Sequence, residues 1–355
     1  MKRLTLALLV LGVAGGLLLV WGSPVGARPL DAPRILNAPS AFYQPLVAGM
    51  ISQVTQTAVY NYEAQFTGQT SVLVGGSPYT FTTRNTSSGT PIQKATQYVY
   101  ERLQALGLNT TYHNWSSSYC SLSNRNVIGE LAGTVNPNEI VVISAHLDDM
   151  PSNGAAPGAD DNASGAVGVL MAAEILSGYP FERTLRFVFF TGEEQGLCGS
   201  DEYAYAADQR GDNIVAVYNL DMIAYDSTGG PTLRLHTRPT GNSGYAADLA
   251  IAGVFTNVVQ AYGLSGVLTP IITADGDDGS DHWSFWDYGY PAIMAIEDDY
   301  DDWNAYYHTA NDSLNHINLV YFTNFVKASV GTAAHLARPR ILSLPPRAYL
   351  PLMRR

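Results

Sequence analysis

Four short apolar runs, separated by helical patterns, most constrain how this chain can fold. They are NVIGEL (126–131), EIVVISA (139–145), TLRFVFF (184–190) and NIVAVYNL (213–220). Apolar residues recur at helical spacing over 41–64 and 92–106, and further helices are expected to begin near Asn162 and Gly199. Buried strands that alternate with helices predict an α/β layered fold with a largely parallel central sheet.

The two ends of the chain lack this pattern. Residues 1–27 begin with basic residues and continue as an apolar stretch that ends in small residues, as a secretory signal peptide does. Cleavage after Ala27 and an extracellular location are expected, with an uncleaved anchor helix as the alternative. Residues 28–40 form a Pro-rich leader or propeptide, 41–338 one continuous domain, and 339–355 a Pro-rich tail.

The charge of the chain limits its partners. There are 31 acidic and 19 basic side chains, for a formal net charge of −12, and Lys and Arg do not cluster. A nucleic-acid-binding surface needs such a cluster, so no nucleic-acid partner is expected. A monomer without stable membrane association is expected after the signal is removed.

Side chains that can ligate a metal directly follow three of the predicted strands. Ligands of parallel sheets bind at the carboxyl ends of strands, so these side chains are expected to converge. They are His146 and Asp148 after 139–145, Glu193 and Glu194 after 184–190, and Asp221 after 213–220. Asp160 joins them from the turn before the helix near Asn162, where a helix N-terminus tolerates a carboxylate.

This donor set is typical of hydrolytic zinc sites, which combine histidine with carboxylates. One shared carboxylate, with a histidine and a further carboxylate for each of two ions, requires two histidines and three carboxylates. Another carboxylate then remains as a general base. A later histidine, His308 in YYHTANDS, would complete the set.

Six motifs occur in one order along the chain: AHLDD, GADDNASG, TGEEQGLCGS, NLDM, GSDHWSFW and YYHT. From about residue 90 to the C-terminal helix, the chain resembles the secreted co-catalytic dizinc aminopeptidases of the bacterial leucyl aminopeptidase type. The resemblance implies a three-layer α/β/α zinc-exopeptidase fold over 41–338, with a mixed, largely parallel sheet. It also implies two Zn²⁺ per chain and the release of N-terminal, apolar residues from peptides with a free N-terminus.

The resemblance further implies a role for each residue of the motifs. His146 and Asp221 would bind one zinc ion, and Glu194 and His308 would bind the other. Asp160 would bridge the two ions. Glu193 would be the general base that takes a proton from the attacking water, and Asp148 would orient the imidazole of His146.

Residues near these motifs receive other interpretations. Ser280 and His282 would support the wall of the metal site, and the resemblance implies a cis peptide between Asp160 and Asp161. The remaining aspartates of the motifs are expected to cap helices or lie at the surface, and the remaining histidines to be structural or exposed. These are Asp149, Asp161 and Asp201, and His113, His236, His316 and His335.

One departure concerns the stabilisation of the oxyanion. Three residues before the serine of its SDH motif, the chain has Asp277 where well-known members of the resembled family have an aromatic hydroxyl. An anion cannot stabilise an oxyanion, so either zinc does more or a tyrosine such as Tyr225 or Tyr307 substitutes. The expected walls of the pocket for the first substrate side chain are Met222, Met294, Trp303, Tyr306 and Tyr307.

Three other functions are alternatives. A carboxypeptidase of the same architecture would need a cationic clamp, for which only Arg234 and Arg238 are suitably located in the sequence. A glutaminyl cyclase would use one zinc, and a non-catalytic receptor-like domain would have lost ligands.

Two further features are a pair of cysteines and two acidic loops. Cys120 and Cys198 are the only cysteines, and an exported chain meets oxidising conditions, so they are predicted to form a disulfide. Two acidic loops, 275–281 and 297–302, raise the prospect of a Ca²⁺ site, with an acidic rim that attracts the substrate's α-amine as the alternative.

Overall fold

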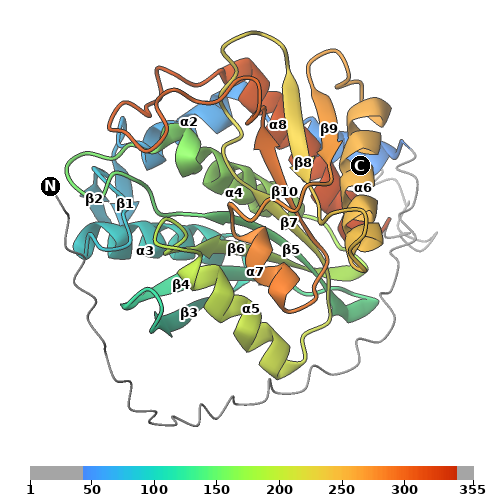
Figure 1. The fold of residues 1–355 in the computed structure, drawn as a ribbon, viewed down its shortest axis with the longest axis horizontal. Coiled ribbons are helices and arrows are strands. Elements are labelled where there is room, and N and C mark those ends of the chain that lie inside the picture. The colour runs from blue at the N-terminus through green and yellow to red at the C-terminus, as the bar shows by residue number, and fades with distance from the viewer. Residues whose placement is uncertain (1–42, 342–355) are drawn as a thin grey trace, which may run out of the picture. The chain divides into compact units, whose positions relative to one another are not determined.

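An eight-stranded sheet organises residues 43–341, the part of the chain that the computed structural model describes (Figure 1). In spatial order its strands are β3 (Asn109–Ser117), β4 (Leu122–Leu131), β6 (Arg183–Phe190), β5 (Asn136–His146), β7 (Ile214–Leu220), β10 (Ala292–Glu297), β8 (Thr232–His236) and β9 (Thr269–Thr273). The four central strands, β6, β5, β7 and β10, are parallel, whereas β3–β4, β4–β6 and β10–β8 are antiparallel pairs. The predicted mixed, largely parallel sheet is confirmed.

Helices cover both faces of the sheet and complete three layers. One face carries α1 (Pro45–Ile51), α2 (Gln56–Phe66), α3 (Thr90–Ala105), α4 (Gly165–Leu176), α6 (Tyr245–Ala261) and α8 (Leu319–Ala337). The other carries α5 (Cys198–Arg210) and α7 (His282–Asp287), which pack on each other. Alternate residues of β5 enter the two cores, Val141 and Ile143 on one side and Ile140 and Val142 on the other, as the pleat of a strand requires.

All four strands predicted from apolar runs are present, as β4, β5, β6 and β7. The helix expected over 41–64 is divided into α1 and α2, with residues 41 and 42 outside the described part. The division falls before Thr55, which is extended and whose side chain accepts the N–H of Ala58 at 3.2 Å. A capping threonine begins a new helix at this point.

The predicted disulfide is confirmed. Cys120 and Cys198 are bonded, with their Cα atoms 6.4 Å apart. Cys120 lies in the turn between β3 and β4, and Cys198 begins α5. The bridge therefore fastens the β3–β4 hairpin to the end of the loop that carries Glu193 and Glu194.

The predicted signal peptide (1–27) and leader (28–40), and the tail (339–355) from residue 342 onward, lie outside the described residues. Within 43–341, none of the helices combines the length and the apolar character needed to cross a bilayer.

Buried His335 makes stability depend on pH. It is 2% exposed in α8, its Nε2 receives the Tyr262 hydroxyl at 2.9 Å, and burial lowers its pKa to about 4. An unfolded histidine binds its proton below about pH 6.5, so between these values only the unfolded state is protonated. The free energy of unfolding should therefore fall as pH falls, by about 1.4 kcal/mol per pH unit from this group.

The measurement is urea unfolding from pH 7.5 to 4 of the wild type and of His335→Gln. Below pH 6.5, the free energy of unfolding of the variant should depend less on pH than that of the wild type. Above pH 6.5, the two curves of free energy against pH should be parallel. Equal slopes throughout would contradict the assignment.

Candidate metal centre

The carboxyl ends of three adjacent parallel strands meet at one edge of the sheet. β5 ends at His146, Asp221 directly follows β7, and the loop after β6 carries Glu193 and Glu194. The segment η1 (Ala159–Ser164), whose backbone is not helical at Asp161 and Asn162, and the loop after β10 add further side chains. The predicted convergence of polar residues at this edge is present.

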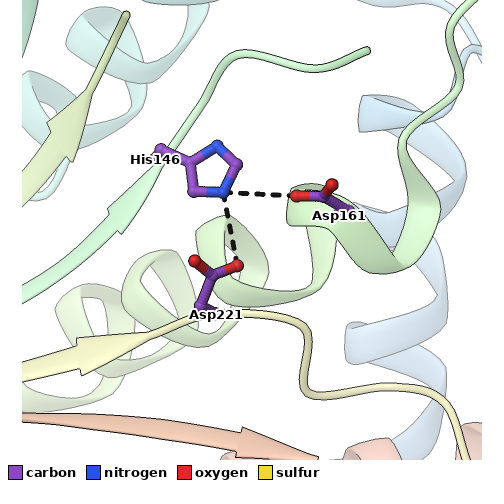
Figure 2. A group of neighbouring side chains, drawn as sticks. All are labelled: His146, Asp161 and Asp221. Carbon is purple, nitrogen blue, oxygen red and sulfur yellow. Dashed lines mark hydrogen bonds and ion pairs between the residues drawn. The ribbon is translucent and has the colours of Figure 1, made fainter. Parts of the chain in front are cut away.

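The first group of potential ligands contains His146, Asp161 and Asp221 (Figure 2). His146 Nε2 lies 3.3 Å from Asp161 Oδ1 and 3.3 Å from Asp221 Oδ1. All three residues are buried. One imidazole nitrogen and two carboxylate oxygens thus face a common point.

The second group contains His308, Glu194 and again Asp161. His308 Nε2 lies 2.9 Å from Glu194 Oε2 and 3.2 Å from Asp161 Oδ2. Asp161 therefore offers one carboxylate oxygen to each histidine, which is the geometry of a residue shared by two sites.

Asp160 does not belong to either group, which corrects the expectation that it is the shared residue. Its Oδ1 accepts the N–H of Ala224 at 2.9 Å, and its Oδ2 accepts Nδ2 of Asn304 at 2.9 Å. The expectation that Asp161 is a capping or surface residue is likewise wrong. The cis peptide also lies one residue later than predicted, between Asp161 and Asn162.

Asp148 is buried beside His146, where an orienting carboxylate was expected. Its Oδ1 lies 3.8 Å from His146 Nδ1, and its main-chain oxygen is closer to the same nitrogen, at 3.2 Å. The carboxylate also lies 3.4 Å from the amide nitrogens of both Glu193 and Glu194. Asp148 thus links the end of β5 to the loop after β6.

Burial raises the pKa of both carboxyl groups of this loop. Burial raises the pKa of Glu193 well above its usual range, although the charge of His146 acts against this shift. Burial and then the charge of Asp161 raise the pKa of Glu194 to about 8. Oε1 of Glu194 is buried and has no hydrogen-bond partner among the described residues.

The carboxylates strongly stabilise positive charge at the two histidines. Burial opposes the charged form of His146, but Asp221 and Glu193 raise its pKa well above the usual range. Burial also opposes the charge of His308, yet its contacts with Asp161 and Glu194 raise its pKa to about 10. The electrostatic potential between the two groups therefore suits cations.

Asp312 holds the backbone at Asp160 and Asp161. It was not identified from the sequence. Its carboxylate accepts the N–H of Asp160 at 3.1 Å and the N–H of Asp161 at 3.0 Å. The only signal was its location four residues after His308 in YYHTANDS. Through Asp312, the loop that carries His308 fixes the backbone that carries Asp161.

Asp149 is buried, not at the surface as expected, and lies 3.4 Å from the buried guanidinium of Arg84. Asp201 is exposed in the first turn of α5, in agreement with a capping or surface role. In the SDH motif, Ser280 donates to Asp221 Oδ2 at 2.5 Å, whereas His282 contacts the main-chain oxygen of Asp277 at 2.9 Å. Ser280 therefore orients a potential ligand, and His282 holds the loop.

A small apolar cluster adjoins Asp221. Met222, Met294 and Ile296 are buried, and Tyr307 packs against them. Tyr307 also stacks on His308, with ring centroids 3.7 Å apart. The ring of Trp303 packs edge-on against Tyr307. Of the two tyrosines suggested for the oxyanion, Tyr307 is thus the one in contact with a potential ligand.

The two acidic loops have protein partners of opposite charge. Arg234 lies within 3.4 Å of carboxylate oxygens of Asp298, Asp299 and Asp301. His236 lies 3.1 Å from Asp275 and 3.2 Å from Asp299. Much of the negative charge is therefore balanced within the protein.

Comparison with known proteins gives a consistent result. The model of peptidase family M28 matches residues 126–332, more than half of the chain. Leucine aminopeptidase 1 of Aspergillus oryzae is 30% identical over 273 residues, which cover 72% of this chain and 68% of that protein.

Solved structures share the fold. The Legionella pneumophila LapA aminopeptidase superposes with a TM-score of 0.65 at 21% identity, over 82% of this chain and 74% of that chain. A glutaminyl cyclase of Bacteroides thetaiotaomicron superposes with a TM-score of 0.59 at 17% identity, over 78% and 97%. At these identities the likeness shows the fold alone. The family match and the Aspergillus relative establish that the chain belongs to peptidase family M28, which confirms the resemblance to metallo-aminopeptidases found in its motifs.

Proposed function

We propose that the protein is a secreted aminopeptidase that uses two zinc ions to remove N-terminal, preferably apolar residues from peptides. The observation that carries the proposal is the Asp161 carboxylate, which faces His146 with one oxygen and His308 with the other. Each histidine has a second carboxylate, from Asp221 or Glu194. This is the complete donor set of two cation sites with one shared ligand.

The residues fit zinc by the chemistry of their donors. Zinc binds imidazole nitrogen and carboxylate oxygen, and catalytic sites keep a position free for water or substrate. His146 and Asp221 would hold one ion and Glu194 and His308 the other, with Asp161 shared. Zinc supplies Lewis-acid chemistry, which activates water and polarises the scissile carbonyl.

Glu193 would move the proton. Its carboxylate would accept a proton from the attacking water and deliver it to the leaving amine. Burial raises the pKa of Glu193, which suits this role because a more basic carboxylate accepts a proton more readily. Asp148 would hold the imidazole of His146 in one orientation.

The carboxypeptidase alternative loses its support. Arg238 makes a two-point contact with buried Asp248, at 2.7 and 2.8 Å, and Arg234 is occupied by the acidic loop after β10. A clamp for a substrate carboxylate needs a guanidinium that is available. A one-zinc cyclase and a receptor-like domain are disfavoured because the chain keeps three potential ligands for each of two ions.

Substrate selection would follow from charge and apolar contact. The acidic surroundings of the site suit the positive α-amine of a peptide. The cluster of Met222, Met294, Ile296 and Tyr307 would receive an apolar side chain. For Ca²⁺, the candidate ligands would be His236, Asp275 and Asp277, although Arg234 and His236 already pair with carboxylates of the acidic loops. The disulfide supports export, since such bonds persist in oxidising compartments.

The proposed function predicts hydrolysis of leucine p-nitroanilide but not of its N-acetylated form, which lacks the free amine. Dialysis against a chelator should abolish the activity, and Zn²⁺ should restore it. Cleavage of the acetylated substrate at a similar rate, or activity that survives metal removal, would contradict the proposal.

Glu193→Gln should lower kcat by about 10²- to 10⁴-fold, because the amide cannot accept the proton. Elemental analysis should still find the wild-type zinc content. Glu182→Gln, at the opposite end of β6, is the control and should keep wild-type kcat. Near wild-type turnover of Glu193→Gln would remove Glu193 from the mechanism.

The two adjacent aspartates should differ in their effect on metal binding. Asp161→Ala should reduce the zinc content below two ions per chain, because it removes the shared ligand. Asp160→Asn should retain two ions, since its carboxylate contacts Ala224 and Asn304. Zinc would be measured by elemental analysis after dialysis, and the reverse pattern would restore Asp160 as the bridge.

A further inference from the structure

We propose that Thr86 is a positioning residue that holds the end of β5 and the loop after β6 in the relative arrangement required by His146 and Glu193. The inference rests on the proposed function, because it concerns the geometry of the same metal centre. Thr86 lies in the segment between the short strand β2 (Ser77–Tyr79) and α3, away in sequence from every potential ligand.

The hydroxyl of Thr86 takes part in two hydrogen bonds, once as the donor and once as the acceptor. It donates to Asp148 Oδ2 at 2.9 Å and accepts the N–H of Gly192 at 2.8 Å. Asp148 adjoins His146, and Gly192 directly precedes Glu193. One buried hydroxyl therefore connects the carboxylate beside His146 to the loop that carries the proposed base.

Thr86 is itself held firmly in place. The preceding Arg84 is fully buried, and its guanidinium donates to the main-chain oxygens of Phe66, Leu147, Pro157 and Gly158. Nδ2 of Asn85 donates to the main-chain oxygen of Asp149 at 2.8 Å. The carbonyl of Thr86 accepts Nδ2 of Asn124 at 2.9 Å. Because this segment is anchored, the Thr86 hydroxyl can hold Asp148 and Gly192 in place.

Removal of this hydroxyl would leave two buried polar groups with one partner fewer, the Gly192 N–H and the Asp148 carboxylate. Between Asp148 and the loop that carries Glu193, the two longer contacts of 3.4 Å to the amides of Glu193 and Glu194 would then remain. Partners of this kind, which orient ligands without touching the metal, typically account for about 10- to 100-fold in metal affinity or activity.

The test compares three variants of the full chain. Thr86→Val keeps the shape and removes the hydroxyl, and Thr86→Ser keeps the hydroxyl. Thr83→Val is the matched control, because the Thr83 hydroxyl also donates to an aspartate, Asp149, at 3.0 Å and accepts an N–H, that of Asn85, at 3.0 Å. The measurements are zinc affinity by competition with a chromogenic chelator, kcat and KM on leucine p-nitroanilide, and amide hydrogen exchange of 192–194 in zinc-free protein.

Thr86→Val should weaken zinc binding or lower kcat by about 10- to 100-fold with little change in KM, and should speed exchange at 192–194. Thr86→Ser should restore all three values, and Thr83→Val should match the wild type. A valine variant with wild-type values, a serine variant as impaired as valine, or failure of the valine variant to fold would overturn the positioning role. If the wild type itself binds no zinc and cleaves no substrate, the proposed function fails instead.

Discussion

The Asp161 carboxylate, which lies between two imidazoles, is the contact on which the rest of the centre depends. Its oxygens face Nε2 of His146 and of His308, and these contacts hold its pKa at about 2 even though burial acts in the opposite direction. A buried carboxylate is costly unless positive charge faces it. The same potential that favours charged histidines would favour two divalent cations, so the electrostatics and the proposed chemistry agree.

The fold brings the partners of Asp161 together from distant parts of the sequence. The parallel central strands deliver His146 and Asp221 to one edge of the sheet, and Asp312 ties the backbone of Asp161 to the loop of His308. Thr86 and the Cys120–Cys198 bridge fasten the loop of Glu193 at its two ends. The central strands, Asp312, Thr86 and the disulfide therefore all help to fix the spacing of the few side chains that would carry out the chemistry.

Apolar runs and residue types were enough to predict three of the four central parallel strands, β5, β6 and β7, and the edge at which His146, Glu194 and Asp221 meet. Residue types could not distinguish Asp160 from Asp161, because both are aspartates of one turn. The backbone conformation of this turn determines which carboxylate faces His146 and His308. The break between α1 and α2 was also missed, because apolar residues recur at helical spacing on both sides of the capping residue Thr55. The edge strands β3 and β9 were not predicted because partly exposed strands carry polar residues instead of a continuous apolar run. The short strands β8 and β10 were missed as well, although most of their residues are buried.

Diffraction from zinc-loaded crystals on both sides of the zinc absorption edge would show whether Asp161 joins two zinc sites. Two anomalous peaks are expected about 3.5–4 Å apart, with one oxygen of Asp161 facing each. His146 and Asp221 should complete one site, and Glu194 and His308 the other. A single peak, or two peaks bridged by Asp160, would show that Asp161 is not the shared ligand.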